Sequence, residues 1–203
     1  MNKAEKFESI LEQFPSGKCV IFSAPSGAGK TTIVRYLLRN IESFEFSISA
    51  ASRAPRGREI DGEDYFFFSV EEFKQKIARE EFVEWEEVYQ DNFYGTLKSQ
   101  VIEFWKEGKT ILFDVDALGG INLKKIFKDQ ALSIFIRPPS LFVLEERLKN
   151  RKTETSEQIK MRLDKANEEL TYSDQFDYVL LNDNLEKACH EIEEVVKKFI
   201  SAK

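Results

Sequence analysis

A short loop of small residues, residues 24–31, constrains the fold of this chain more than any other segment. Its sequence is Ala24-Pro25-Ser26-Gly27-Ala28-Gly29-Lys30-Thr31. It joins an apolar run, residues 19–22, to a segment in which apolar side chains recur at helical spacing, residues 33–41. A glycine-rich turn between a buried strand and a helix directs backbone N–H groups and the positive end of the helix toward one point, where an anion can bind. The segment therefore predicts a phosphate-binding loop in an α/β fold.

The parts of this loop have separate expected roles. Gly27 and Gly29 allow the backbone to bend close to the phosphates of a nucleoside triphosphate. Lys30 supplies a cation for the β- and γ-phosphates, and the hydroxyl of Thr31 can bind Mg²⁺. The strict phosphate-loop pattern has glycine where Ala24 stands. The interpretation therefore depends on the placement of the loop between a strand and a helix. The ATP-binding residues expected here are Ala24, Pro25, Ser26, Gly27, Ala28, Gly29, Lys30, Thr31 and Thr32.

Apolar runs typical of buried strands recur along the rest of the chain. They cover residues 110–115, 131–136 and 178–181, with a further candidate strand at 45–49. Segments with helical spacing lie around them, at residues 4–14, 140–150, about 156–170 and 185–201. Thr155 and Gln158 fit a capping box at the start of one of these helices. Strands that alternate with helices predict a mainly parallel sheet with helices on both faces.

Two charged segments interrupt this alternation. Residues 51–97 are dense in Arg, Asp, Glu and aromatic side chains, and residues 138–170 are dense in Arg, Lys and Glu. Peripheral segments of this kind close over substrates in many enzymes. We therefore expect two insertions, at about 51–97 and 138–170, on one domain that spans residues 18–203. An N-terminal helical extension is expected over residues 1–17, and the domain core over about 18–50, 98–137 and 171–203.

Composition narrows the class of protein further. The chain has 30 Lys and Arg against 36 Asp and Glu, and the net charge of −6 argues against a general binder of nucleic acids or anionic membranes. Residues 1–14 contain no unbroken apolar stretch, so we expect a cytoplasmic protein. Cys19 and Cys189 are expected to be buried thiols in a reducing compartment. The single histidine, His190, is expected on a solvated helix face, which argues against a Ser/His or Cys/His mechanism.

A second motif follows the phosphate loop. Its sequence is Ser47-Ile48-Ser49-Ala50-Ala51-Ser52-Arg53-Ala54-Pro55-Arg56-Gly57, followed by Asp61-Gly62-Glu63-Asp64-Tyr65-Phe66-Phe67. With residues 81–85 and 92–96, it makes the chain resemble the guanylate kinases from about residue 18 onward. The resemblance implies a phosphate-loop NTPase-type parallel sheet core flanked by helices, with an NMP-binding insertion at 51–97 and a helical lid at 138–170. It also implies in-line transfer of the γ-phosphoryl group of MgATP to GMP.

The resemblance assigns a GMP site to the first insertion. The residues that it implies are Ser49, Arg53, Arg56, Tyr65 and Tyr94 for the phosphate, and Glu84, Thr96 and Asp116 for the guanine. Two arginines three residues apart offer planar, bidentate donors to a dianion. A carboxylate can accept from both N1–H and N2–H₂ of guanine. An arginine-rich loop is more often solvated surface, and spacing alone does not separate Glu84 from its acidic neighbours.

The lid and the metal site follow from the same resemblance. Arg147, Arg151 and Arg162 match the lid arginines, which with Lys30 and Arg53 would neutralise the transferring phosphoryl group. Surface ion pairing is the alternative interpretation of these arginines. Asp114 ends an apolar run, where it can bind Mg²⁺ through water together with Thr31. Asn182 matches the adenine contact of the family, although Asn-Asp after a strand is also ordinary turn chemistry. Leu118 stands where the family often has Gln.

The expected partners are therefore ATP and GMP, without nucleic acid or membrane, and the choice between monomer and homo-oligomer stays open. Two other functions remain as alternatives. The first is a non-catalytic interaction module of the same fold, but such modules lose the phosphate-loop and lid residues that are present here. The second is a kinase for another nucleotide, against which Glu84 and the pair Arg53 and Arg56 argue.

Overall fold

The computed structural model describes residues 3–150 and 155–202, which form two compact units. Unit 1 contains the described residues of Met1–Gly17 together with Glu45–Ile111. Unit 2 contains Lys18–Phe44 and the described residues of Leu112–Lys203. The first insertion expected from the sequence falls in unit 1, and the described part of the expected lid falls in unit 2.

The larger sheet has five strands in the order β2-β7-β1-β8-β9. Their bounds are Phe44–Phe46 for β2, Thr110–Asp114 for β7, Cys19–Ser23 for β1, Ala131–Arg137 for β8 and Tyr178–Leu181 for β9. Strands β1 and β8 pair in parallel, as do β8 and β9. Every residue of β1 is buried, as its unbroken apolar run predicts for a central parallel strand. The parallel α/β core expected from the sequence is thus confirmed.

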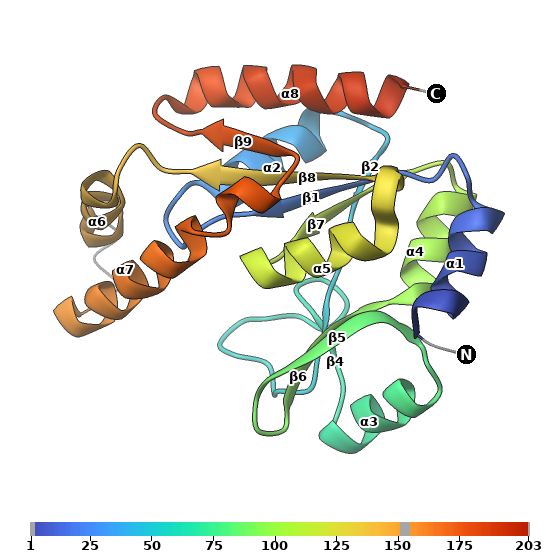
Figure 1. The fold of residues 1–203 in the computed structure, drawn as a ribbon. Coiled ribbons are helices and arrows are strands. Elements are labelled where there is room, and N and C mark those ends of the chain that lie inside the picture. Colours follow the sequence, from blue (N-terminus) through green and yellow to red (C-terminus); the bar gives the residue numbers. More distant parts are fainter. Residues whose placement is uncertain (1–2, 151–154, 203) are drawn as a thin grey trace. The chain divides into compact units, whose positions relative to one another are not determined.

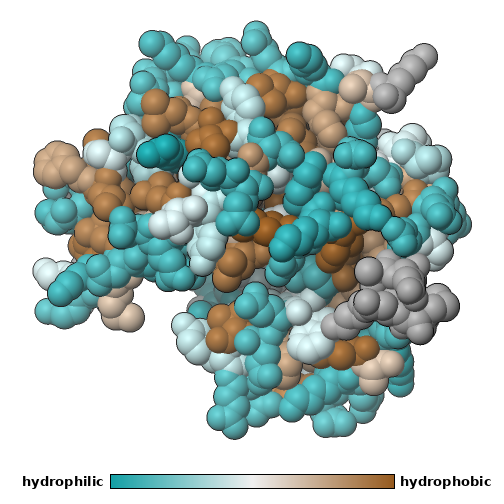
Figure 2. Space-filling model, in the orientation of Figure 1, coloured by the Kyte–Doolittle hydropathy of each residue, from teal (hydrophilic) through white to brown (hydrophobic). Residues whose placement is uncertain are grey.

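Helices cover both faces of this sheet within unit 2, as Figure 1 shows. Helices α2 (Lys30–Asn40) and α8 (Leu185–Ser201) lie on one face, and α5 (Ala117–Phe127) lies on the other. Helix α2 buries Ile33, Val34 and Leu37, which share one face because they are three and four residues apart. The outward side of α8 is largely hydrophilic along the upper edge of Figure 2. His190 is exposed, as expected, and its ring lies 6.4 Å from that of Tyr36 in α2, measured between ring centroids.

Two further helices of unit 2 lie in the expected lid. Helix α6 spans Leu141–Asn150 and α7 spans Ser156–Leu170. They share an apolar cluster that includes Leu144, Leu148 and Ile159. The predicted capping box is confirmed, because Thr155 accepts from the backbone of Gln158 and the Gln158 side chain accepts from the backbone of Thr155.

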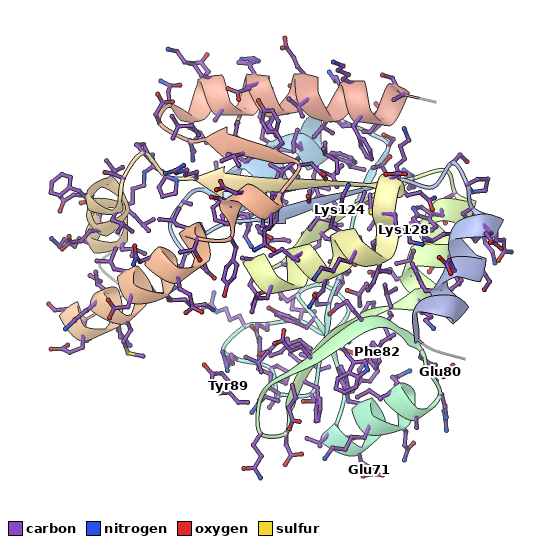
Figure 3. The ribbon with its side chains drawn as sticks, in the orientation of Figure 1. Glu71, Glu80, Phe82, Tyr89, Lys124 and Lys128 are labelled. Carbon is purple, nitrogen blue, oxygen red and sulfur yellow. The ribbon has the colours of Figure 1, made fainter. Side chains whose placement is uncertain are left out.

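Unit 1 is built on a four-stranded sheet in the order β4-β3-β6-β5. Its elements are β3 (Ala50–Ala51), β4 (Phe66–Phe67), α3 (Val70–Ala78), β5 (Phe82–Tyr89), β6 (Asn92–Leu97), α1 (Lys3–Gln13) and α4 (Lys98–Lys106). Phe73 of α3 stacks on Phe82 at 4.4 Å and on Phe93 at 5.5 Å between ring centroids. Figure 3 labels Phe82 in this core and Tyr89 near the hairpin tip, where its side chain is 74% exposed.

Helix α1 lies beside α4 in Figure 1, and Phe14, just after α1, contacts the ring of Trp105.

A hydrogen-bonded carboxylate fixes the start of β9. The chain also forms two short 3₁₀ turns, η1 (Lys128–Gln130) just before β8 and η2 (Ser173–Gln175) just before β9. Asp177 accepts from both the backbone and the hydroxyl of Ser133 at 2.8 Å, and pairs with Lys124 at 2.9 Å (Figure 3 labels Lys124). Burial raises the pKa of Asp177, but the hydrogen bonds from Ser133 and Lys124 outweigh burial and hold the pKa below its ordinary value.

We predict that Asp177→Ala lowers the free energy of unfolding by about 1–3 kcal/mol near neutral pH, because Ser133 and Lys124 lose their shared acceptor. Since the folded-state pKa is depressed, this stabilisation is present above the unfolded pKa and disappears as pH falls through the folded value. Urea unfolding of both proteins at pH 7 and pH 3 measures the difference. Asp129→Ala, an exposed site in η1, is the matched control and should change little. Equal stability of Asp177→Ala and wild type at pH 7 would contradict the prediction.

Candidate functional site

The loop between β1 and α2 has the backbone of an anion site. Gly27 and Gly29 have φ angles of 93° and 101°, in the region that favours glycine. A Cβ on Gly29 would also collide with Nδ2 of Asn182. Within the described residues, the backbone N–H groups of Gly27, Gly29, Lys30 and Thr31 have no acceptor. These N–H groups, at the start of α2, are available to an anionic ligand.

The ammonium group of Lys30 lies between the carboxylate of Asp114 and the carbonyl of Val115, at the end of β7. Its Nζ is 2.5 Å from a carboxylate oxygen of Asp114 and donates to the carbonyl of Val115 at 2.8 Å. Both partners of the ion pair remain partly exposed. The sequence predicted Lys30 and Asp114 for different tasks, and the structure brings them into direct contact.

A pocket of about 370 Å³ surrounds this pair within unit 2. The phosphate loop forms one wall, and Asp114, Asp116, Arg162, Lys165 and Glu169 contribute to the others. Arg162 of α7 donates to the hydroxyl of Ser26 at 2.5 Å, so this predicted lid arginine reaches the phosphate loop. Sequence reasoning missed Lys165 and Glu169. Their helical spacing of three and seven residues from Arg162 could have indicated that they share its face.

The side chains of Asn182 and Arg147 both donate to the carbonyl of Ala28 in the same loop. The Asn182 side chain donates to the carbonyl of Ala28 at 2.7 Å, and Arg147 donates to the carbonyl of Asn182 at 2.9 Å. Asn182 is buried, and its Oδ1 has no hydrogen-bond donor among the described residues. A buried acceptor without a donor is uncommon in folded proteins and indicates a missing partner. The expected contact with adenine would supply one, and it stays a prediction.

Asp116 has a structural role that the sequence did not reveal. One of its carboxylate oxygens accepts from the backbone N–H of Gly119 at 2.8 Å and caps α5. The Ser23 hydroxyl donates to its carbonyl at 2.9 Å. Leu118, where the family often has Gln, is 46% exposed in the first turn of α5. Asp116 therefore caps α5, and its expected contact with guanine stays a prediction.

Unit 1 brings three of the predicted phosphate ligands together. Arg53 donates from Nε to the hydroxyl of Tyr94 at 3.0 Å, and its guanidinium carbon lies 4.8 Å from the ring centroid of Tyr65. The two tyrosine rings meet edge to face at 6.1 Å. Burial raises the pKa of Tyr65, so its hydroxyl keeps its proton at neutral pH. Both terminal nitrogens of Arg53 contact Glu59, a residue that sequence reasoning did not assign.

The two predicted guanine-reading residues of unit 1 form a pair across the β5–β6 hairpin. Glu84 and Thr96 face each other in the strand register, and the Thr96 hydroxyl donates to Glu84 at 2.8 Å. Tyr94 lies two residues before Thr96 and therefore on the same face of β6. Arg56 is exposed beside this cluster, while the Ser49 carbonyl accepts from Phe66. Arg151, the remaining predicted lid arginine, lies outside the described residues.

Comparison with known proteins decides the family. The profile of the guanylate kinase family matches residues 16–199. The chain belongs to the guanylate kinase family. It is similar to the guanylate kinase of Bacteroides thetaiotaomicron, with 50% identity over 195 residues that cover 96% of this chain and 95% of that protein. The guanylate kinase of Chlorobaculum tepidum is 43% identical over 193 residues, covering 95% and 97% of the two chains. This family membership makes the chain a nucleoside monophosphate kinase.

A solved structure gives the same result for the fold. The crystal structure of guanylate kinase from Anaplasma phagocytophilum superposes with a TM-score of 0.70 at 27% identity, covering 92% of this chain and 88% of that one. Among residues 3–150 and 155–202, no helix is long and apolar enough to cross a bilayer. The same residues contain no cluster of His, Cys, Asp and Glu that could hold a metal ion by itself.

We predict that Glu169→Gln stabilises this guanylate kinase family member at neutral pH. Glu169 is 9% exposed, and burial raises its pKa, with the charge of Asp116 adding to the effect. A carboxyl whose folded-state pKa is raised opposes folding once pH exceeds the unfolded value, so the gain should appear at pH 7 and vanish near pH 4. Urea denaturation of both proteins at these pH values is the test. Glu168→Gln, at the exposed neighbouring position, serves as the control. A loss of stability at pH 7 would mean that attraction to Lys165 and Lys30 outweighs desolvation.

Proposed function

We propose that the chain transfers the γ-phosphoryl group of ATP to GMP, giving ADP and GDP by direct in-line displacement. The observation that carries the proposal is the Glu84–Thr96 pair, because the hydrogen bond orients the Glu84 carboxylate of β5 on the face of the β5–β6 hairpin that also carries Tyr94. Guanine presents N1–H and N2–H₂ on one edge, which such a carboxylate accepts together. Adenine has a lone pair at N1 and would be repelled.

Unit 2 would bind the donor. The backbone N–H groups of Gly27, Gly29, Lys30 and Thr31 have no acceptor among the described residues, and with the cation of Lys30 they suit the β- and γ-phosphates. Arg162 and Arg147 already lie against the loop and would add positive charge around the transferring group. Phosphoryl transfer depends on alignment and charge neutralisation more than on covalent help, and these side chains supply both.

The residues near Lys30 also fit Mg²⁺. One carboxylate, Asp114, and one hydroxyl, Thr31, are too few for an all-protein site but suit an ion that keeps several waters and binds phosphate oxygens. When bound, the ion neutralises charge on the β- and γ-phosphates. Asp114 also forms the ion pair with Lys30.

The acceptor needs no general base. A phosphomonoester has a second pKa near ~6 and is mostly dianionic at neutral pH, so its oxygen is already a nucleophile. The tasks of Arg53, Tyr65 and Tyr94 would be to bind and orient that oxygen. Cys19 and Cys189 are buried free thiols, which supports a cytoplasmic location for the enzyme.

We predict that Lys30→Ala lowers kcat by on the order of 10²–10³, the loss typical of removing one preorganised charge donor. The protein should stay folded, because Lys30 is partly exposed and its ammonium group binds polar groups at the end of β7. A coupled assay of ADP formation, with circular dichroism on the same samples, measures both properties. Arg35→Ala, on the exposed side of the same helix, should retain activity. Near-wild-type kcat in Lys30→Ala would contradict the assignment of the phosphate loop.

We predict that Glu84→Gln lowers kcat/KM for GMP by about 5- to 150-fold, since an amide donor would then oppose a guanine N–H at a cost of about 1–3 kcal/mol. IMP lacks the 2-amino group, so the variant should disfavour it less than wild type does. Glu86→Gln, the next residue on the same face of β5, is the control. An unchanged GMP/IMP ratio in Glu84→Gln would show that Glu84 does not read the base.

A substrate panel separates the three functions that the sequence left open. ADP formation would be measured with GMP, AMP, UMP and dTMP. Activity with GMP alone supports the proposal, activity with another nucleotide points to a different kinase, and no activity with any of them points to an interaction module.

A further inference from the structure

Glu59 makes a bidentate ion pair with Arg53 in unit 1. Its two carboxylate oxygens lie 2.6 Å from Nη1 and 2.8 Å from Nη2. The Arg53 side chain is only 8% exposed and that of Glu59 is 24% exposed. A paired-fork geometry of this kind orients a guanidinium far better than a single exposed contact does. The hydrogen bond from Arg53 holds the pKa of Glu59 at about 2, so the carboxylate is charged at neutral pH.

The remaining donors of Arg53 show where a ligand can bind. Nε donates to the hydroxyl of Tyr94, and Nη1 donates to the carbonyl of Ala54 in addition to Glu59. Within the described residues, a single N–H of Arg53, on Nη2, has no acceptor. Nη1 and Nη2 each direct one N–H toward Glu59. Because the guanidinium is planar, the second N–H of Nη2 is then parallel to the Nε–H bond. It therefore points to the side on which Tyr94 lies.

The hydroxyl of Tyr94 completes this arrangement. Because its oxygen accepts from Nε of Arg53, its own hydrogen is directed to another acceptor. A phosphate oxygen beside Tyr94 can meet this O–H and the remaining N–H of Arg53 together. Glu59 does not have to leave for that to happen.

Glu59 also orders the turn that carries the second arginine. Its carboxylate accepts from the backbone N–H of Arg56 at 2.7 Å, and its own N–H donates to the Arg56 carbonyl at 3.1 Å. Gly57, inside this turn, has a φ of 59°, which allows the chain to close tightly. One carboxylate thus fixes the guanidinium of Arg53 and the backbone of Arg56.

We propose that Glu59 is a positioning residue for the acceptor phosphate, which it serves by holding Arg53 with one N–H directed beside Tyr94. The inference rests on the proposed function, because it takes the phosphate of GMP as the ligand of Arg53. Glu59 touches no substrate and acts through Arg53. The negative charge of Glu59 repels a dianionic phosphate. Even so, Glu59 leaves one N–H of Nη2 for the ligand, so it orients Arg53 without blocking the phosphate site.

The test measures GMP binding by calorimetry to the full chain and its variants. Glu59→Gln should raise the Kd for GMP by about 2- to 12-fold, the range expected when one long side chain must be ordered on binding. KM for GMP should rise more than kcat falls, and KM for ATP should not change. In an Arg53→Ala background, Glu59→Gln should have a much smaller effect than in wild type, because only its hold on the turn of Arg56 then remains. Glu63→Gln, an exposed glutamate in the same loop, is the control and should bind GMP as wild type does.

The outcomes separate this inference from the function on which it rests. Unchanged or tighter GMP binding in Glu59→Gln, with weak binding in Arg53→Ala, overturns the positioning role and leaves the site intact. Unchanged binding in Arg53→Ala overturns the acceptor site and the role of Glu59 together. Glu59→Asp, which keeps the charge but cannot span both nitrogens, should also weaken GMP binding, so the conclusion does not depend on one variant folding well.

Discussion

The loop between β1 and α2 leaves several backbone N–H groups without acceptors among the described residues, and contacts within unit 2 hold the loop in that conformation. Positive φ angles at Gly27 and Gly29 turn these groups outward. Asn182 and Arg147 hold the carbonyl of Ala28 on the other side. Unpaired N–H groups are costly when buried, so they persist only at a partly open site where water or an anion can reach them. The parallel strands on either side provide the rigid frame that such a loop needs.

A second constraint is that the partly buried cation of each proposed site needs an anionic partner within the protein. Lys30 pairs with Asp114, and Arg53 pairs with Glu59. The two pairs differ in their consequences. The Lys30–Asp114 contact joins two groups that each have a proposed ligand, so binding would rearrange it. The Arg53–Glu59 contact leaves one N–H open, so binding can add to it. Partial burial makes both pairs stronger than exposed ion pairs and more dependent on geometry.

The sequence predicted most elements of unit 2 closely, because buried parallel strands and amphipathic helices have strong local patterns, but it did not predict helix α5. The runs at 19–22, 131–136 and 178–181 all became strands of one sheet, and the expected helix at 185–201 has the observed bounds. The strand at 45–49 was displaced to Phe44–Phe46, since one short apolar stretch does not define its own ends. Site residues were harder to identify. Glu59, Lys165 and Glu169 are ordinary charged residues in charged segments, and no local pattern sets them apart.

By itself, the sequence determined the phosphate loop, the positions along the chain of the core strands and of most helices of unit 2, and the residues that match the family. These depend on neighbours within a few positions, where side-chain period and glycine content are sufficient. Tertiary structure decided which polar and charged groups come into contact. Arg53 reaches Tyr94 across 41 positions, and Asn182 reaches Ala28 across 154. Such contacts depend on strand register and loop closure, which bring distant residues within hydrogen-bonding distance only after the sheet has formed.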